Sequence, residues 1–250
     1  ELWGPKQTRS GRFNGLLRPW DADDSETHRL IARNKGAINM ELERLEKSGR
    51  TTVMISEENM MGSIRANLRG CRLYQGLEQR LERFADTFGS SCVRVGLGIR
   101  PYEYYWSSSM AYAIPKGHRG FDPGSLEQLV VQPRTWRQIV AEMASVFHNC
   151  EITIWEFDRM IGRPARQFRQ LTAGKNGLWL SPLAVRANAS AGRMALRQVF
   201  ADRGDQVSAA RIKEGDGRYM PFAEQQIERM REEYARDLTW LRATSGGAVK

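Results

Sequence analysis

Three short runs of β-branched and apolar residues separate stretches of helical periodicity, and this alternation limits the chain to few folds. The runs are "TTVMIS" at 51–56, "CVRVGLGI" at 92–99 and "EITIWEF" at 151–157. Runs of this length suit buried strands better than helices. Strands that alternate with helices favour a parallel sheet whose two faces are covered by helices. The predicted fold class is therefore α/β, with three layers.

Apolar residues recur at helical spacing in several stretches, and turn or capping residues bound most of them. Asp122 is placed to cap a short helix, and Thr135 with Gln138 forms a capping box for the next. The length of 250 residues allows one sizeable core, so we predict a single domain over 1–250 with a loop-rich insertion at 165–220. The predicted helices span 27–47, 74–88, 102–114, 122–131, 136–147 and 221–242.

The charge balance is strongly basic, with 38 Lys and Arg residues against 29 Asp and Glu residues and a formal net charge of +9. Such an excess attracts polyanions and anionic small molecules. The same charges lie in helical stretches rather than in a tail, which is equally typical of solvated helix faces. No nucleic-acid partner is predicted, because the sequence has no recognition helix, RNP-like strand or basic tail.

Cysteine usage and hydropathy set the expected compartment. Cys71, Cys92 and Cys150 lie far apart with no CxxC pair, so neither a zinc site nor a disulfide framework is predicted, and no metal is expected. No run reaches the roughly 18 apolar residues of a membrane helix, and no signal peptide opens the chain. We expect a cytoplasmic protein with no membrane partner.

Polar residues follow each predicted strand, where a parallel α/β sheet binds its ligands. Arg100 ends the second strand, and Ser107, Ser108 and Ser109 come within the next turns. A guanidinium and hydroxyls together suit a phosphate or another oxyanion. An arginine at a strand end also commonly pairs with a surface carboxylate, and serines commonly cap turns, so a purely structural role is an open alternative.

An arginine at a strand end with a serine eight positions later, Arg100 and Ser108, resembles the 3′-phosphate-binding motif of sulfotransferases. The surrounding "IRPYEYYWSSSMAYA" at 99–113 is similar to the version found in bacterial sulfotransferase-like proteins. Three other stretches resemble the same group, and the resemblance spans roughly 3–241. They are "VMISEENMMG", "ITIWEFDRM" and "MPFAEQQIERMREEYARDLTWL".

The resemblance implies a P-loop NTPase-like sulfotransferase fold and the donor 3′-phosphoadenosine 5′-phosphosulfate, with Arg100 and Ser108 on its 3′-phosphate. Such enzymes open with a strand, a Lys/Gly/Thr-containing loop and a helix that hold the phosphosulfate. We find no match to that loop, and "AGKNG" at 173–177 follows no predicted strand. Because the first 25 residues show no clear period and no Met opens the chain, we expect the first strand and helix to lie upstream of Glu1.

A sulfotransferase also needs a base for the acceptor hydroxyl or amine. Glu57 and Glu58 follow the first predicted strand, and burial beside Met60 and Met61 would raise the pKa of a carboxyl into a useful range. The equal alternative is that one of the two glutamates caps the helix that follows.

A basic loop carries the residues that we expect to bind the acceptor, a glycan or small molecule: Lys116, His118 and Arg119. His148 lies between a predicted helix and strand, where a structural role is favoured. The aromatic residues between Tyr102 and Trp106 are expected mainly to pack between helix and sheet. The competing function is a non-catalytic binding or scaffold protein that keeps the sulfotransferase fold without the phosphosulfate loop.

Overall fold

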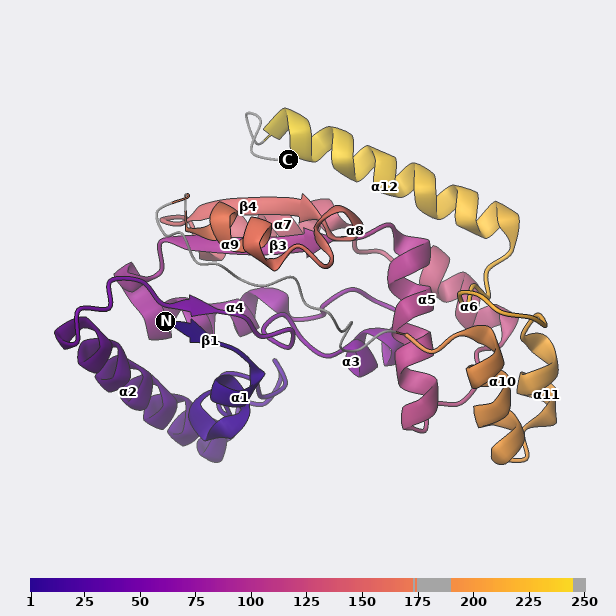
Figure 1. The fold of residues 1–250 in the computed structure, drawn as a ribbon, viewed down its shortest axis with the longest axis horizontal. Helices are drawn as coiled ribbons and strands as arrows, with labels where there is room; N and C mark the ends of the chain where they lie inside the picture. Colours follow the sequence, from indigo (N-terminus) through magenta and orange to yellow (C-terminus); the bar gives the residue numbers. More distant parts are fainter. Residues whose placement is uncertain (173, 175–189, 245–250) are drawn as a thin grey trace. The chain divides into compact units, whose positions relative to one another are not determined.

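The computed structural model describes residues 1–172, 174 and 190–244 (Figure 1). The chain divides into two compact units. The first unit holds Glu1–Ala66, Tyr74–Val93 and Ile139–Glu151. The second unit holds Asn67–Leu73, Arg94–Gln138 and Ile152–Lys250. Within the last range, residues 173, 175–189 and 245–250 lie outside the described residues.

The first unit contains a small parallel sheet. Strand β1 (Leu2–Trp3) pairs in parallel with β2 (Met54–Ile55). Helix α1 (Pro5–Gln7) and the π-helical turn η1 (Thr8–Arg12) follow β1 directly. The sequence analysis assigned no regular element to this opening segment, and that was wrong. A two-residue strand and two short turns are too brief to produce a hydrophobic period.

Helices and aromatic side chains complete the first unit. Helix α2 (Ser25–Lys47) begins at Asp24, whose carboxylate accepts a 2.7 Å hydrogen bond from the Thr27 amide. Helix α4 (Leu77–Phe88) and the 3₁₀ turn η2 (Gly89–Ser91) follow later in the chain. The buried Phe13 ring packs edge-on against Trp3 and Phe84, at centroid distances of 6.4 and 6.0 Å. These contacts bury the N-terminal segment against α4.

A buried arginine on α4 holds two loops of the first unit. The Arg80 guanidinium donates to the carbonyl oxygens of Leu17, at 3.0 Å, and of Asn59 and Met60, at 2.7 and 2.8 Å. Burial lowers the pKa of Arg80 to about 10. Hydrogen bonds from the charged Arg80 side chain therefore hold the segment that follows β2 in place.

The second unit is built around β3 (Arg94–Ile99) and β4 (Glu151–Glu156), which form a two-stranded sheet and run in the same direction (Figure 1). All three predicted strands are confirmed, and the mixed helix and strand content fits the predicted α/β class. The four strands of the described residues form two separate pairs, β1 with β2 and β3 with β4.

Helices account for most of the second unit. Four helices confirm sequence predictions: α5 (Tyr102–Ala113), α6 (Pro123–Val130), α7 (Trp136–Val146) and α12 (Glu224–Thr244). Helix α7 begins in the second unit and continues in the first. The Asp122 carboxylate caps α6 through the Ser125 amide at 2.9 Å, as predicted. The Gln138 side chain accepts from the Thr135 amide at 2.8 Å, which is half of the predicted capping box.

The 165–220 stretch is more helical than predicted. Its helices are short and bury few apolar residues, such as Leu196 and Phe200 in α10, so they give only a weak periodic signal. The remaining elements are α3 (Ile64–Arg69), η3 (Ile114–Lys116), α8 (Phe157–Met160), α9 (Pro164–Leu171), α10 (Arg193–Asp202) and α11 (Gln206–Arg211).

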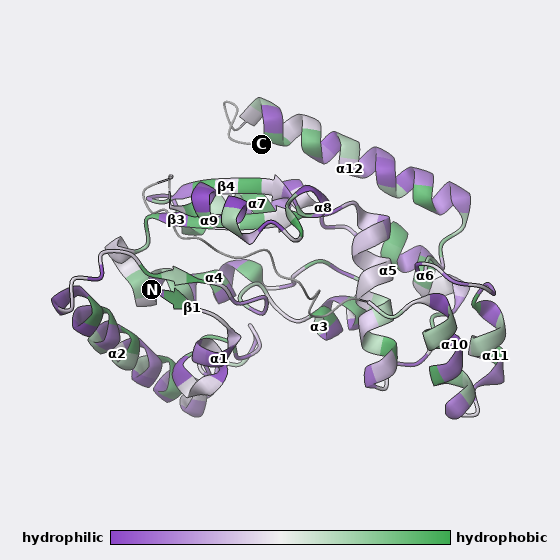
Figure 2. Cartoon of the chain, in the orientation of Figure 1, coloured by the Kyte–Doolittle hydropathy of each residue, from purple (hydrophilic) through white to green (hydrophobic). Residues whose placement is uncertain are grey.

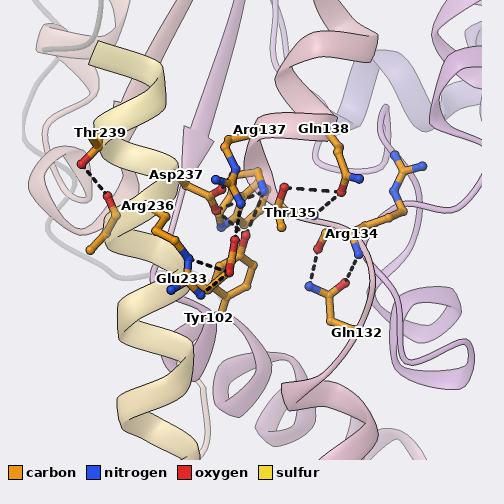
Figure 3. Close-up of polar contacts among 12 residues, drawn as sticks. Tyr102, Gln132, Arg134, Thr135, Arg137, Gln138, Glu233, Arg236, Asp237 and Thr239 are labelled. Carbon is orange, nitrogen blue, oxygen red and sulfur yellow. Dashed lines mark hydrogen bonds and ion pairs between the residues drawn. The ribbon is translucent and has the colours of Figure 1, made fainter. Parts of the chain in front are cut away.

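Helix α12 is attached to the second unit by buried polar contacts (Figure 3). The carboxylate of Asp237, which is 0% exposed, accepts hydrogen bonds from the Tyr102 hydroxyl and, at 3.2 Å, from the Trp136 amide. Arg137 pairs with the second Asp237 oxygen at 2.9 Å and with Glu233. Burial raises the pKa of Asp237, while the Tyr102 hydrogen bond and Arg137 act in the opposite direction.

Hydrophilic residues lie along the whole length of α12 among hydrophobic ones (Figure 2). Two further ion pairs extend the polar attachment, from Arg231 to Glu103 at 2.9 Å and from Arg229 to Glu127 at 2.7 Å. Among the described residues, no helix combines the length and apolar character needed to cross a bilayer.

Candidate functional site

Helix α5 is buried on most sides and leaves one narrow stripe partly accessible. Eight of its twelve residues are buried, among them Ser107 and Ser109. The other four, Tyr104, Tyr105, Ser108 and Tyr112, are half-buried. Tyr104, Ser108 and Tyr112 are spaced four residues apart, which places them on one helix face. The only serine of the predicted trio that a ligand can reach is therefore Ser108.

Arg100 lies between the end of β3 and the start of α5, at the N-terminal end of this stripe. Its Nε and Nη2 atoms donate to the Asp158 carboxylate at 3.1 and 3.0 Å, in a two-point ion pair. The guanidinium also lies 5.1 Å from the Phe157 ring centre and 5.9 Å from that of Tyr104. The Arg100 side chain is 15% exposed, whereas that of Asp158 is 40% exposed, so water reaches the pair from the aspartate side.

One alternative for Arg100 was a structural ion pair with a carboxylate, and Asp158 provides that carboxylate. A two-point contact to a carboxylate uses the same fork that recognises a phosphate. The contacts to Asp158 involve only the Nε and Nη2 atoms of the guanidinium. The ion pair fixes the orientation of the arginine without using all of its donors.

The three serines of α5 have different partners. The Ser107 hydroxyl contacts the Met220 sulfur at 3.1 Å, and the Ser109 hydroxyl donates to the Tyr105 carbonyl at 2.7 Å. The Ser108 Oγ lies 2.6 Å from the Ser190 Oγ. None of the three caps a turn, which was the alternative for them, because all lie inside α5.

A second arginine, which the sequence analysis missed, lies beside the stripe. The Arg218 guanidinium is 4.6 Å from the centre of the Tyr104 ring, so Tyr104 has arginine neighbours from two different segments. The backbone of Arg218 forms an antiparallel bridge with Gly192. No local motif marks Arg218, because its segment meets α5 only in the folded chain, where the neighbouring Met220 also contacts Ser107.

Lys116 lies at the other end of the stripe, with Nζ 3.4 Å from the centre of the Tyr112 ring. We call the set Arg100, Tyr104, Ser108, Tyr112, Lys116 and Arg218 the α5 face. It carries three cationic side chains, while the carboxylate of Asp158 is bound to one of them. The arrangement can attract an anion and offer it both guanidinium and hydroxyl donors.

The other aromatic residues of this stretch pack, as predicted. Tyr102 stacks on Trp136 at 6.1 Å, and Trp106 is fully buried. Tyr105 contacts Trp106 edge-on at 5.0 Å and its hydroxyl accepts a 2.7 Å hydrogen bond from Asn67. Tyr104 is the exception, because it lies on the accessible stripe.

The structure separates the predicted acceptor-binding residues. Lys116 belongs to the α5 face, whereas His118 and Arg119 line a groove of about 380 Å³ together with Arg203 and Ser208. A larger groove of about 790 Å³ lies between α6 and α12. Its charged residues are Glu127, Glu228, Glu232 and Arg229, and Arg229 is paired with Glu127. This acidic lining would repel a phosphate.

Glu57, a predicted catalytic base, lies in the first unit and is held by many donors. Its carboxylate accepts from the Thr8 hydroxyl at 2.6 Å, from Arg9 at 2.7 and 3.0 Å, and from the Asn59 amide at 3.0 Å. Burial favours the neutral acid and is the largest single influence. The hydrogen bonds from Arg9, Thr8 and Asn59 together outweigh it and lower the pKa of Glu57 to about 2. The expected rise in pKa was wrong for this residue.

Glu58, the other predicted base, is more accessible, with a side chain 60% exposed and one 3.0 Å contact to Arg9. Neither glutamate caps a helix: Glu57 accepts from the amide two residues later, in a turn, and α3 does not begin until Ile64. Both residues belong to the first unit, and the α5 face belongs to the second. Their part in catalysis stays a prediction.

No group of three or more His, Cys, Asp or Glu side chains in the described ranges has the arrangement of a metal site. The "AGKNG" stretch lies, apart from Gly174, outside the described residues. Comparison of the chain with protein-family models, with curated proteins and with solved structures found no match.

Proposed function

We propose that the chain is a sulfotransferase-like protein that binds 3′-phosphoadenosine 5′-phosphosulfate, with the 3′-phosphate on the α5 face. The observation that carries the proposal is the accessible stripe of α5. It exposes the one motif serine, Ser108, while burying its two neighbours, and Arg100 stands at its N-terminal end. This is the pairing of arginine and serine that the family resemblance requires.

The chemistry of the stripe supports a phosphate rather than a neutral ligand. Arg100 and Arg218 can each donate to phosphate oxygens, and the hydroxyls of Ser108 and Ser190, 2.6 Å apart, can turn their protons toward the same anion. The Tyr104 ring, beside both guanidinium groups, supports them through cation–π contacts. Lys116 adds a longer-range positive charge.

In the proposed reaction, an acceptor hydroxyl or amine attacks the sulfur in line. The new bond to sulfur forms as the bond from sulfur to the bridging oxygen of the donor breaks, and adenosine 3′,5′-bisphosphate leaves with the bonding electron pair. The acceptor proton passes to a base. Glu57, with a pKa of about 2, is a poor proton acceptor at neutral pH, so the proposal leaves Glu58 as the predicted base.

The same proposal includes a three-layer fold of the sulfotransferase type and a cytoplasmic location. Strand β1 is followed at once by Gly4, Lys6 and Thr8, which are the residue types of the loop that the sequence analysis did not find in this chain and expected upstream of Glu1. The three cysteines are free thiols, as suits a reducing compartment. The expected acceptor is a glycan or small molecule.

One observation favours the second candidate, a non-catalytic binding protein with the same fold. The Thr8 hydroxyl, in the segment after β1, is fully buried and bound to Glu57 rather than available to a phosphosulfate. Such a protein would bind the adenosine bisphosphate through the α5 face without transferring sulfate.

Two measurements separate these possibilities. Calorimetric titration with adenosine 3′,5′-bisphosphate tests the α5 face, and binding that is unchanged in both Arg100→Ala and Ser108→Ala would refute the assignment. Incubation with sulfur-labelled donor and a panel of hydroxylated acceptors tests transfer. Nucleotide binding without any labelled product would favour the non-catalytic protein.

A further inference from the structure

The groove of about 380 Å³ in the second unit is bordered by the loop between α5 and α6 and by residues of α10 and α11. The loop approaches α11 closely at Gly120, where a Cβ atom would lie 2.4 Å from the Ser208 Oγ. A side chain at this position would require the Ser208 hydroxyl to move. The volume is within the range of small-molecule sites, roughly 300–1,000 Å³.

His118 is held in one orientation at this groove. Its ring stacks on Phe121 at 4.6 Å with an interplanar angle of 9°, and its amide donates to the Ala113 carbonyl at 3.1 Å. The Nδ1 atom lies 2.7 Å from the Arg119 carbonyl oxygen. Because a carbonyl oxygen can only accept, Nδ1 carries the proton, and neutral His118 has its acceptor lone pair on Nε2.

The charged groups that line the groove favour an anion. Arg119 and Arg203 are exposed, and Arg203 also donates to the His118 carbonyl at 3.3 Å. The one carboxylate, Asp205, is already occupied, since it accepts from the Ser208 amide at 2.9 Å. Hydrogen bonds from the Ser208 hydroxyl and amide lower the pKa of Asp205, so it is ionised. Its single negative charge is outweighed in the lining by the two guanidinium groups of Arg119 and Arg203.

We propose that this groove binds a small hydroxylated oxyanion of the carboxylated-sugar class. Arg119 and Arg203 hold the carboxylate, and the Nε2 atom of His118 and the Ser208 oxygen accept hydrogen bonds from sugar hydroxyls. Anion binding here requires no donor nucleotide. The further statement that this sugar is the sulfuryl acceptor rests on the proposed function.

The test follows the imidazole signals of the protein by NMR during titration. The chain has three histidines, so His118→Gln assigns the relevant signals, and His28 and His148 act as internal references. D-Glucuronate is expected to shift the His118 signals saturably, and D-glucose at the same concentrations is expected to leave them unmoved. Inorganic sulfate is expected to bind more weakly than glucuronate, because it has no hydroxyls for His118.

Variants locate the anion contact. Arg119 and Arg203 are both exposed, so each can be replaced without disturbing the core. We expect Arg119→Gln and Arg203→Gln each to weaken glucuronate binding by about tenfold, because a charge-assisted hydrogen bond is lost. Arg33→Gln removes the same charge from the exposed side of α2 and should change nothing. Equal weakening by Arg33→Gln, or the absence of a saturable His118 shift, would overturn the proposal.

Sulfate that binds as tightly as glucuronate would overturn the sugar assignment. Arg100→Ala should leave glucuronate binding unchanged, so failure of the groove and failure of the nucleotide site are separate results.

Discussion

Arg100 and Asp158 form a two-point ion pair, with Nε to Oδ2 at 3.1 Å and Nη2 to Oδ1 at 3.0 Å, at the carboxyl end of β3. The pair brings a carboxylate next to the arginine that we propose to bind a phosphate. A carboxylate there orients the guanidinium but also repels the incoming anion. The balance between these two effects can be measured.

Replacing the carboxylate should strengthen nucleotide binding. In Asp158→Asn the repulsion is lost while the side-chain shape is kept, so the affinity for adenosine 3′,5′-bisphosphate should rise by about three- to tenfold, or roughly 1 kcal/mol. Calorimetric titration at low and high salt checks this. Weaker binding in Asp158→Asn would mean that the pair's orienting effect outweighs its repulsion.

The three consecutive serines provide a matched set. Ser108→Ala should weaken binding of adenosine 3′,5′-bisphosphate by about five- to tenfold, because a hydrogen bond to a charged group is lost. Ser109→Ala should have no effect on affinity, since its hydroxyl is buried and donates to the Tyr105 carbonyl. Equal effects of the two substitutions would show that the α5 stripe is not the binding surface.

Glu57 is expected to support stability rather than catalysis. Glu57→Gln leaves Arg9 without its buried ionic acceptor and should lower the free energy of unfolding of the chain by about 2–3 kcal/mol at neutral pH. Urea denaturation followed by circular dichroism measures this. As a control, Glu58→Gln should cost less than about 1 kcal/mol, because the Glu58 side chain is 60% exposed.

The same carboxyl group predicts a pH dependence. The folded-state pKa of Glu57, about 2, lies below its ordinary value of 4.5. The stabilisation that ionised Glu57 gives the folded chain is therefore fully present above pH 4.5 and is lost as the pH falls through 2. The difference in unfolding free energy between the natural chain and Glu57→Gln should shrink over that interval. A difference that is constant down to pH 2 would contradict the account.

The attachment of α12 depends on Asp237. Asp237→Ala leaves the Tyr102 hydroxyl, the Trp136 amide and Arg137 without their buried acceptor and should cost about 3–5 kcal/mol of unfolding free energy. Glu233→Ala, one turn earlier on the same helix, removes a more exposed partner of Arg137 and should cost about 1 kcal/mol or less. Thermal unfolding of both variants tests the ranking, and similar losses would contradict it.

Long apolar elements were predictable from the sequence. The apolar run at 92–99 and the apolar and aromatic stretch at 102–114 correspond to β3 and α5, because both elements are largely buried. The two-residue β1 and the short α10 and α11 were missed, since each is too short or buries too few apolar residues to give a clear periodic signal.

The candidate site was predictable only in part. Arg100 and Ser108 follow from a local motif, and the α5 face contains both. Arg218 was not predictable, because it lies far from Tyr104 in the sequence and only the folded chain brings the two together. The low pKa of Glu57 was equally hidden, since it depends on donors about fifty residues away, in the segment after β1.

The most direct test of the α5 face is its discrimination between adenosine 3′,5′-bisphosphate and adenosine 5′-phosphate, which differ only in the 3′-phosphate. Calorimetric titration of the natural chain should give at least about tenfold tighter binding of the bisphosphate. Arg100→Ala and Ser108→Ala should each reduce that ratio toward one by weakening the bisphosphate alone. A ratio near one in the natural chain, or a ratio that both substitutions leave unchanged, would contradict the proposed 3′-phosphate site.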